Sequence, residues 1–325
     1  MAVRLAGAAA LRSHVSVGAH DDRPHWTCAF VNNMPDGAFD ATERQFLDLL
    51  EAASGSEVIE LRRYAVAGVP RGERTAARIA EQYLSVSAIE FNAPDLLIVT
   101  GSNPLEPRIE DEPYWNELVD LLSWSRQNVP AMLLSCLSAH AALSAFDGIE
   151  RQHLASKCTG VFAQEVDNSS PLTAGLAPEI FLPHSRTNTV SQDDLRGAGY
   201  HIDIQSDEVG WSVASREHDE TSLLLIQGHP EYDPSSLLRE YRRDVTRYAT
   251  RERDDLPCLP YHCVAPQDWE GLETMHQAII GGQRDPALVD AYPFEEVGER
   301  AAWPWRSMAK RLYANWLSSV VKRRD

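Results

Sequence analysis

Apolar strand-like runs alternate with amphipathic helical patterns through the first half of the 325-residue chain. The short apolar runs cover residues 26–31, 57–64, 96–100 and 130–136. Between two of them, Trp115, Leu118 and Leu122 recur at helical spacing, and a further helix is expected over residues 74–90. Strands that are joined through helices need crossover connections, which make neighbouring strands parallel. The sequence therefore predicts an α/β fold: a mostly parallel sheet flanked by helices, with additional C-terminal helical elements.

The pattern changes after residue 150, first to short strand-like pieces and then, beyond residue 233, to helices. The segment 252–300 is rich in Pro, Gly and charge, and an amphipathic helical stretch follows it. A chain of this length suits one large domain with an addition. We expect residues 1–22 to be a flexible lead-in and residues 23–250 to form the α/β catalytic domain. Residues 251–325 are expected to be an irregular segment and a C-terminal helix that packs on the same domain.

The composition excludes several classes of partner. The formal net charge is −18 at pH 7, which argues against nucleic acid or an anionic membrane surface, although a few local arginines can still serve an anionic small substrate. No apolar run approaches the roughly 18 residues of a membrane span. The five cysteines include no Cys-x-x-Cys pair, so neither a disulfide framework nor a zinc ribbon is indicated. We expect a cytoplasmic protein with no metal and with small-molecule partners.

The stretch LLSCLSAHAAL, residues 133–143, places Cys136 where an apolar strand turns into a helix. Small neighbours permit a tight turn, and the N-terminus of the helix stabilises a thiolate there. Backbone N–H groups at the turn, including that of Leu137, could bind an oxyanion. A free cysteine is more often a buried structural residue, and the turn alone favours that explanation. His140, four residues further on, is expected to be a packing histidine.

A second turn favours a catalytic role for Cys136 over a structural one. The apolar run LLLIQG ends at Gly228 and is followed by His229, Pro230 and Glu231. A histidine at the carboxyl end of a parallel strand can reach a neighbouring turn, and a carboxylate two residues later can fix its tautomer. His-Pro-Glu alone is most often a loop. Together with Cys136 it supplies a nucleophile, a base and an orienting carboxylate.

Two loops and one helix add candidates for a binding pocket. TGSNPLEP offers exposed backbone N–H groups near Gly101, and PHSRT brings Ser185 and Arg186 together. Arg243 lies in a helix of mixed charge, REYRRD. Taken singly, a polar loop or a solvated helix face explains each of these.

The chain resembles the homoserine O-succinyltransferase (homoserine transsuccinylase) family, within the class I glutamine amidotransferase-like superfamily. The resemblance spans roughly residues 30–316 and rests on nine pieces in family order: VNNMPD, EQYLSVSAIEFNAPDLLIVTG, EPYW, SCLSAHAAL, SKCTGVF, PHSR, GHPEYD, EYRRD and WRSMAKRLYANWL. It implies that Cys136 takes an acyl group from an acyl-coenzyme A to form a thioester. His229 would be the base that serves both half-reactions, and Glu231 would orient it.

The resemblance also implies how the acceptor is held. Arg243, in the family's EYxRD pattern, would bind the carboxylate of an amino acid, and Ser185 and Arg186 would line the acceptor pocket. The acceptor would be homoserine first and serine next. Acetyl- or succinyl-coenzyme A would be a co-substrate rather than a bound cofactor, and family members are often homodimers.

Some positions depart from the family pattern. Asp36 and Gly37 stand where lysines are frequent, and Met308 replaces a histidine. In the family, a glycine shortly after TG accompanies succinyl transfer and a glutamate accompanies acetyl transfer. One extra residue in the loop would align Glu106 with that glutamate, whereas without it Leu105 takes the position. A carboxylate there would repel a succinyl carboxylate, so the alignment on Glu106 favours acetyl.

Two other classes of function stay open. A hydrolase or glutamine amidotransferase of the same superfamily usually carries Gly-x-Cys-x-Gly at the turn, but here Leu134 and Ser138 take the glycine positions. A non-enzymatic binding protein of the same fold is disfavoured by the intact Cys–His–Glu set.

Overall fold

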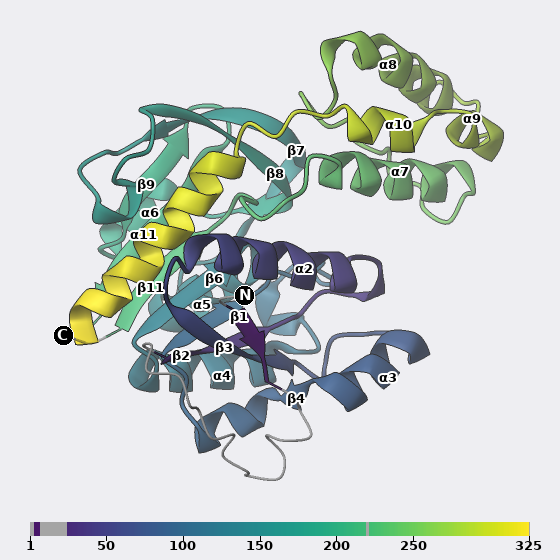
Figure 1. Ribbon diagram of the computed structural model, residues 1–325. Helices are drawn as coiled ribbons and strands as arrows, with labels where there is room; N and C mark the ends of the chain where they lie inside the picture. The colour runs from purple at the N-terminus through teal and green to yellow at the C-terminus, as the bar shows by residue number, and fades with distance from the viewer. Residues whose placement is uncertain (1–2, 7–24, 219–220, 325) are drawn as a thin grey trace.

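The computed structural model describes residues 3–6, 25–218 and 221–324 (Figure 1). The strands form one mixed sheet in the order β1-β3-β2-β5-β6-β11-β10-β9-β7-β8, and β4 pairs with β3. Their bounds are β1 (Val3–Leu5), β2 (His25–Val31), β3 (Val58–Ala65), β4 (Leu84–Ser85), β5 (Leu96–Val99), β6 (Ala131–Ser135), β7 (Gln152–Val166), β8 (Glu179–Thr189), β9 (His201–Ser206), β10 (Gly210–His218) and β11 (Thr221–Ile226). The α-helices are α2 (Asp36–Ala53), α3 (Glu73–Gln82), α4 (Trp115–Asn128), α5 (Leu137–Asp147), α6 (Gln192–Gly197), α7 (Ser236–Ala249), α8 (Pro266–Ile280), α9 (Pro286–Asp290), α10 (Phe294–Glu299) and α11 (Arg306–Arg324).

The sheet has a parallel half and an antiparallel half. Strands β1, β3, β2, β5, β6 and β11 pair in parallel, whereas β10, β9, β7 and β8 continue the sheet with antiparallel pairs. Parallel strands are buried on both faces, so their residues are apolar in succession. In β2, Cys28 and Phe30 face one apolar core and Ala29 and Val31 face the other. The expected α/β fold with a mostly parallel sheet is confirmed.

Helices cover both faces of the sheet. On one face, α2 packs against α11, and the rings of Phe46 and Tyr313 lie 6.5 Å apart between their centroids. On the other face, Leu118 of α4 and Ala142 of α5 belong to the second core. These layers bury both faces of the parallel half of the sheet. The loops that follow its strands meet at their carboxyl ends, which is where ligands bind in folds of this kind.

Beyond the sheet, α7, α8, α9 and α10 gather on one side, and α11 returns along the sheet (Figure 1). The segment 252–300, which was expected to be irregular, thus contains three of these helices. A short parallel bridge ties the chain before α8 to β7, because Val161 donates to the carbonyl of Tyr261 at 2.8 Å. Gly160 permits this close approach, since a Cβ atom there would lie 2.7 Å from the Tyr261 carbonyl oxygen.

The structure differs from the sequence-based prediction at three places. The helix expected over residues 74–90 ends at Gln82, because Leu84 pairs with Tyr64 of β3 and a 3-10 helix follows. Strand β7, which includes Gly160, is 15 residues long, whereas the sequence indicated only short strand-like pieces after residue 150. Residues 3–5, expected to lie in a flexible lead-in, pair with β3 as β1, and the remainder of that lead-in up to residue 22 lies outside the described residues apart from residue 6.

Candidate active site

Cys136 lies on a sharp turn between β6 and α5, as predicted. Its φ of 51° and ψ of −110° are unusual for a residue with a side chain, and a backbone of this kind persists only where the surroundings enforce it. The Cys136 N–H donates to the carbonyl of Ile226 in β11 at 2.6 Å. Ser138 donates its hydroxyl to the Val99 and Ser135 carbonyls at 2.8 and 2.9 Å. The three neighbouring strand ends thus hold the turn, and Cys136 lines the adjoining cavity.

The two residues expected to bind an oxyanion lie beside this cysteine. A Cβ atom on Gly101 would lie 3.1 Å from the Cys136 Cβ and 3.5 Å from the Leu137 nitrogen. Within the described residues, no hydrogen bond occupies the N–H groups of Gly101 and Leu137. Two backbone donors next to a nucleophile are the usual composition of an oxyanion hole.

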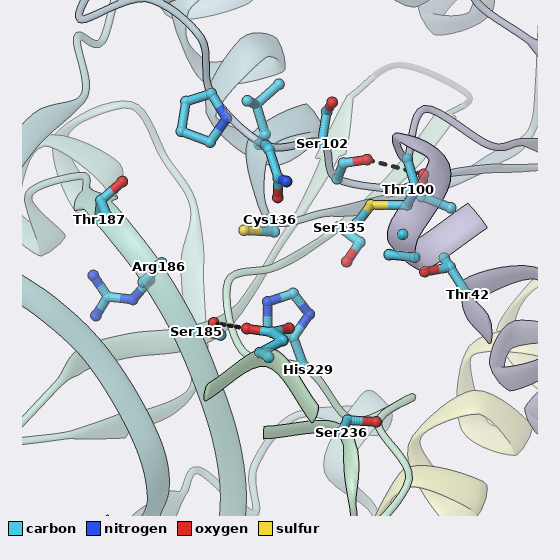
Figure 2. A pocket seen from close by; sticks show the side chains of 18 of the residues that line it. Thr42, Thr100, Ser102, Ser135, Cys136, Ser185, Arg186, Thr187, His229 and Ser236 are labelled. Carbon is cyan, nitrogen blue, oxygen red and sulfur yellow. Dashed lines mark hydrogen bonds between the residues drawn. The ribbon is translucent and has the colours of Figure 1, made fainter. Parts of the chain in front are cut away.

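His229 follows β11 and is held from two sides. Its backbone N–H donates to the Pro183 carbonyl at 2.8 Å, and its Nδ1 lies 2.7 Å from Glu231 Oε1. Because an ionised carboxylate only accepts, Nδ1 carries the proton and Nε2 is left as the base. Nε2 is buried and has no hydrogen-bond partner within the described part of the chain. Figure 2 shows the His229 ring and Cys136 at the same cavity.

The charge of the imidazole depends on its neighbours. Burial is the largest single influence and opposes protonation, yet Glu231 and Cys136 together outweigh it and raise the pKa of His229 well above its usual 6.5. The imidazolium is therefore favoured beside the sulfur. This is the state that a cysteine–histidine pair needs when the histidine has taken the thiol proton.

A second carboxylate, that of the partly buried Glu240, lies close to the imidazole's neighbours, and it was not among the residues predicted from the sequence. The Tyr232 ring stacks on His229 with 4.3 Å between centroids and 18° between planes. Tyr232 and Ser185 both donate their hydroxyls to Glu240, and Lys157 Nζ lies 3.6 Å from the same carboxylate. Burial raises the pKa of Glu240, but Lys157 and the two hydroxyls outweigh it and lower the pKa overall. In the sequence, Tyr232 lies in the HPEYD piece and Glu240 in the EYRRD piece, so these two pieces could have indicated the contact.

The predicted acceptor residues line one cavity of about 640 Å³ together with Cys136 and His229. Arg186 is buried, and its guanidinium donates to the carbonyl oxygens of Asn188 and Val209. Burial lowers its pKa, and the Cys158 and Cys136 thiols oppose that effect. Arg243 instead pairs with Asp244 at 2.8 Å. Both arginines, and Ser185, are therefore brought to the site.

Glu106 is not brought to the site. Its side chain is exposed, and the cavity lining in this loop ends at Leu105. The buried carboxylate of Glu112 accepts the N–H groups of Leu105 at 3.0 Å and Glu106 at 3.3 Å, and Arg151 lies 3.3 Å from the same oxygen. These contacts fix the loop with the Glu106 carboxylate in solvent. In this arrangement Leu105 lines the cavity and Glu106 does not.

His140 is buried at the edge of the cavity, and its Nε2 lies 3.0 Å from the Gln227 side-chain oxygen. Burial lowers its pKa to about 4, so the ring is neutral near pH 7. Among the residues that the structure describes, no three His, Cys, Asp or Glu side chains are grouped as metal ligands would be. No described helix has the length and apolar character needed to cross a bilayer.

Comparisons with known proteins identify the family and the fold of this chain. The profile of the homoserine O-succinyltransferase family matches residues 10–325. A homoserine O-succinyltransferase of Rhodopseudomonas palustris is 38% identical over 90% of this chain and 87% of its own, and one of Methylococcus capsulatus is 34% identical over 96% and 88%. Among solved structures, a glutamine amidotransferase of Thermotoga maritima has the same fold, with a TM-score of 0.50 at 11% identity over 92% of this chain and 99% of its own. The chain therefore belongs to the homoserine O-succinyltransferase family, which confirms both the resemblance drawn from its motifs and its class as an acyltransferase.

Proposed function

We propose that this protein transfers a succinyl group from succinyl-coenzyme A to the hydroxyl of homoserine through a thioester on Cys136. The observation that carries the proposal is the site itself. A cysteine on a constrained turn, a buried histidine oriented by Glu231 and two open backbone donors face one cavity. Membership of the family supports the choice of substrates.

In the first half-reaction, His229 Nε2 holds the proton taken from the Cys136 thiol, and the thiolate attacks the donor's thioester carbonyl. The N–H groups of Gly101 and Leu137 stabilise the oxyanion. The bond to coenzyme A breaks, and its sulfur receives the proton from His229. The acyl group is then held on Cys136 as a thioester.

In the second half-reaction, His229 takes the proton of the acceptor hydroxyl, which attacks the Cys136 thioester. Collapse of the second tetrahedral intermediate releases the O-acyl amino acid, and the sulfur recovers its proton from His229. Arg243 and Arg186 bind the acceptor carboxylate, for which a guanidinium offers paired donors. Ser185 lines the same end of the cavity.

Succinyl replaces acetyl as the preferred donor group. The acetyl preference depended on the Glu106 carboxylate, which lies in solvent and cannot repel a donor. The cavity instead contains seven cationic side chains and three carboxylates among its described lining residues. A second carboxylate on the donor suits this excess of positive charge. The names of the relatives agree with this choice.

The test is mass spectrometry of the intact protein after mixing with succinyl- or acetyl-coenzyme A in the absence of acceptor. We expect the mass of one succinyl group on the wild type and none on Cys136→Ala, with Cys258→Ala as the matched control. Homoserine should discharge the labelled protein faster than serine. Full transfer by Cys136→Ala would disprove the mechanism, and ammonia release from glutamine without acyl transfer would favour the amidotransferase alternative. A cytoplasmic location and a homodimer remain predictions.

A further inference from the structure

The cavity continues from Cys136 into a groove between α2 and α7 whose two walls differ in chemistry. The first turns of the α2 wall carry small side chains, with Gly37, Ala38 and Ala41 on one helical face, and Thr42, Gln45 and Phe46 continue the wall. A Cβ atom on Gly37 would meet nothing within 4 Å, so this part of the wall borders open space. A wall of this kind lets an extended ligand approach the helix backbone closely.

The α7 wall is cationic. Arg239, Arg243 and Arg247 are spaced four residues apart, so they share one face of α7, and all three line the cavity. Arg253 joins them from the segment after the helix. This excess of positive charge lies in a protein whose net charge is −18. The groove therefore selects anions locally, against the field of the whole molecule.

Arg239 and Arg247 are more available to bind a ligand than Arg243 is. Arg243 is engaged by Asp244 at 2.8 Å. Arg247 has a long ion pair, at 3.8 Å to Glu252, and Arg239 has one at 3.5 Å to Asp233 besides hydrogen bonds to the Ser235 and Ser236 hydroxyls. About half of each side chain is exposed (49% and 53%). Exposed pairs of this kind contribute little, so an incoming phosphate can replace them.

The spacing of these arginines identifies the kind of ligand. Eight residues of α-helix separate Arg239 from Arg247, which is about 12 Å along the axis. One amino-acid carboxylate cannot reach both positions, whereas an extended donor with several phosphates can. We propose that Arg239 and Arg247 bind the phosphates of the acyl donor's nucleotide portion, and that its pantetheine arm lies along Gly37, Ala38 and Ala41 of α2. This inference rests on the proposed function, because it assigns the donor end of the same site.

The test compares two donors on three proteins. Succinyl-coenzyme A carries the phosphates, whereas S-succinyl-N-acetylcysteamine has the thioester without them. The proteins are the wild type, Arg239→Ala/Arg247→Ala and the control Arg242→Ala. Arg242 lies on the same helix with a similar exposure of 42%, but it pairs with Glu295 and does not line the cavity.

We expect the double variant to raise KM for succinyl-coenzyme A on the order of 100-fold, at about tenfold for each lost charged contact. Its kcat/KM with the cysteamine thioester should stay within about twofold of the wild type, since no phosphate is present to contact either arginine. The salt dependence of kcat/KM for succinyl-coenzyme A should also become shallower. Arg242→Ala should change none of these.

The outcomes separate this inference from the proposed function. Equal losses with both donors, or no greater loss than in Arg242→Ala, would overturn the phosphate site while leaving the chemistry intact. Transfer from neither donor by the wild type would instead contradict the proposed function. Calorimetric titration with free coenzyme A needs no turnover and decides the phosphate site in that case also. The Kd for coenzyme A must rise in the double variant and must stay unchanged in Arg242→Ala.

Discussion

The two sides of the cavity are built by different means. On the nucleophile side, Cys136, Gly101 and Leu137 are fixed mainly by backbone hydrogen bonds at the ends of parallel strands. On the proposed acceptor side, Lys157 and Glu240 belong to a network of partly buried charges and hydroxyls that joins β7, β8 and α7. Backbone geometry determines the first side, and electrostatic balance determines the second. Changes on the first side should therefore affect kcat, and changes on the second should affect acceptor binding and stability.

The largest effect is expected from Cys136→Ala. Loss of the nucleophile should reduce transfer by at least about 10⁴-fold, because no other group can carry the acyl intermediate. The backbone bond from residue 136 to Ile226 survives in this variant, so the melting temperature should change little. A thermal melt beside the assay tests both statements. Unfolding of the variant would show that the thiol also supports the turn.

Glu231→Gln should come next, with kcat reduced by about 10²–10⁴-fold because the imidazole loses its orienting anion. Glu231 raises the pKa of His229, so its removal lowers that pKa. The limb of the kcat/KM profile that reports the imidazole should then move to lower pH. An unmoved limb would show that Glu231 does not control the charge of His229.

The same pair makes stability depend on pH. A pKa of His229 raised above its usual 6.5 means that the folded protein favours the imidazolium. Its contribution to the free energy of unfolding is full below pH 6.5 and is lost as pH rises through the folded-state pKa. The stability difference between wild type and Glu231→Gln should therefore shrink as pH rises. Denaturant titrations from about pH 5.5 to 9 measure it.

Gly101→Ala tests the backbone side without removing a reactive group. The added Cβ would lie 3.1 Å from the Cys136 Cβ and crowd the oxyanion donors. Misplacing one donor should reduce kcat by about 10²–10³-fold, with little change in acceptor KM. Gly197→Ala is the matched control, since its Cβ would meet nothing within 4 Å. Equal activity of the two variants would contradict the assignment.

The charged side should show the opposite kinetic signature. Glu240→Gln keeps the shape of the side chain but removes the charge that faces Lys157 and accepts from Ser185 and Tyr232. We expect acceptor KM to rise about tenfold and the free energy of unfolding to fall by about 1–2 kcal/mol. A loss confined to kcat would place Glu240 with the nucleophile rather than with the acceptor.

The smallest effect belongs to His140→Gln. Its ring is neutral near pH 7, with a pKa lowered to about 4 by burial, and it bonds to Gln227. The substitution should change kcat/KM by less than about threefold, as expected for a residue that touches no reacting atom. The pH profile should keep its limbs. A shifted limb would mean that His140 titrates with the site.

The nucleophile side of the cavity could be predicted from the sequence, whereas the Lys157–Glu240 contact on the other side could not. The turn around Cys136 and the His-Pro-Glu loop are local in sequence, so the apolar run, the small residues and the following helix were enough to find them. Lys157 and Glu240 lie more than eighty residues apart and meet only because β7 pairs with β8 beside α7. No local pattern predicts such a meeting.

Two departures from the sequence-based expectations come from contacts that the local pattern does not show. A helix continuing past Gln82 satisfied the local pattern, but pairing of Leu84 with β3 outweighed it. Glu106 was placed in the pocket by position along the loop, whereas buried Glu112 holds that loop with the Glu106 side chain outward. In the first case the partner lies in another strand, and in the second it is a buried carboxylate seven residues further along the same loop.

The bridge between Gly160 and Tyr261 has a consequence for how the protein can be shortened. A version that stops at residue 250 would leave the backbone groups of Thr159 and Val161 unpaired along an open strand edge. Open edges of this kind recruit other chains and promote aggregation. The segment around Tyr261 thus pairs with this exposed edge of β7 and keeps other protein molecules from pairing with it.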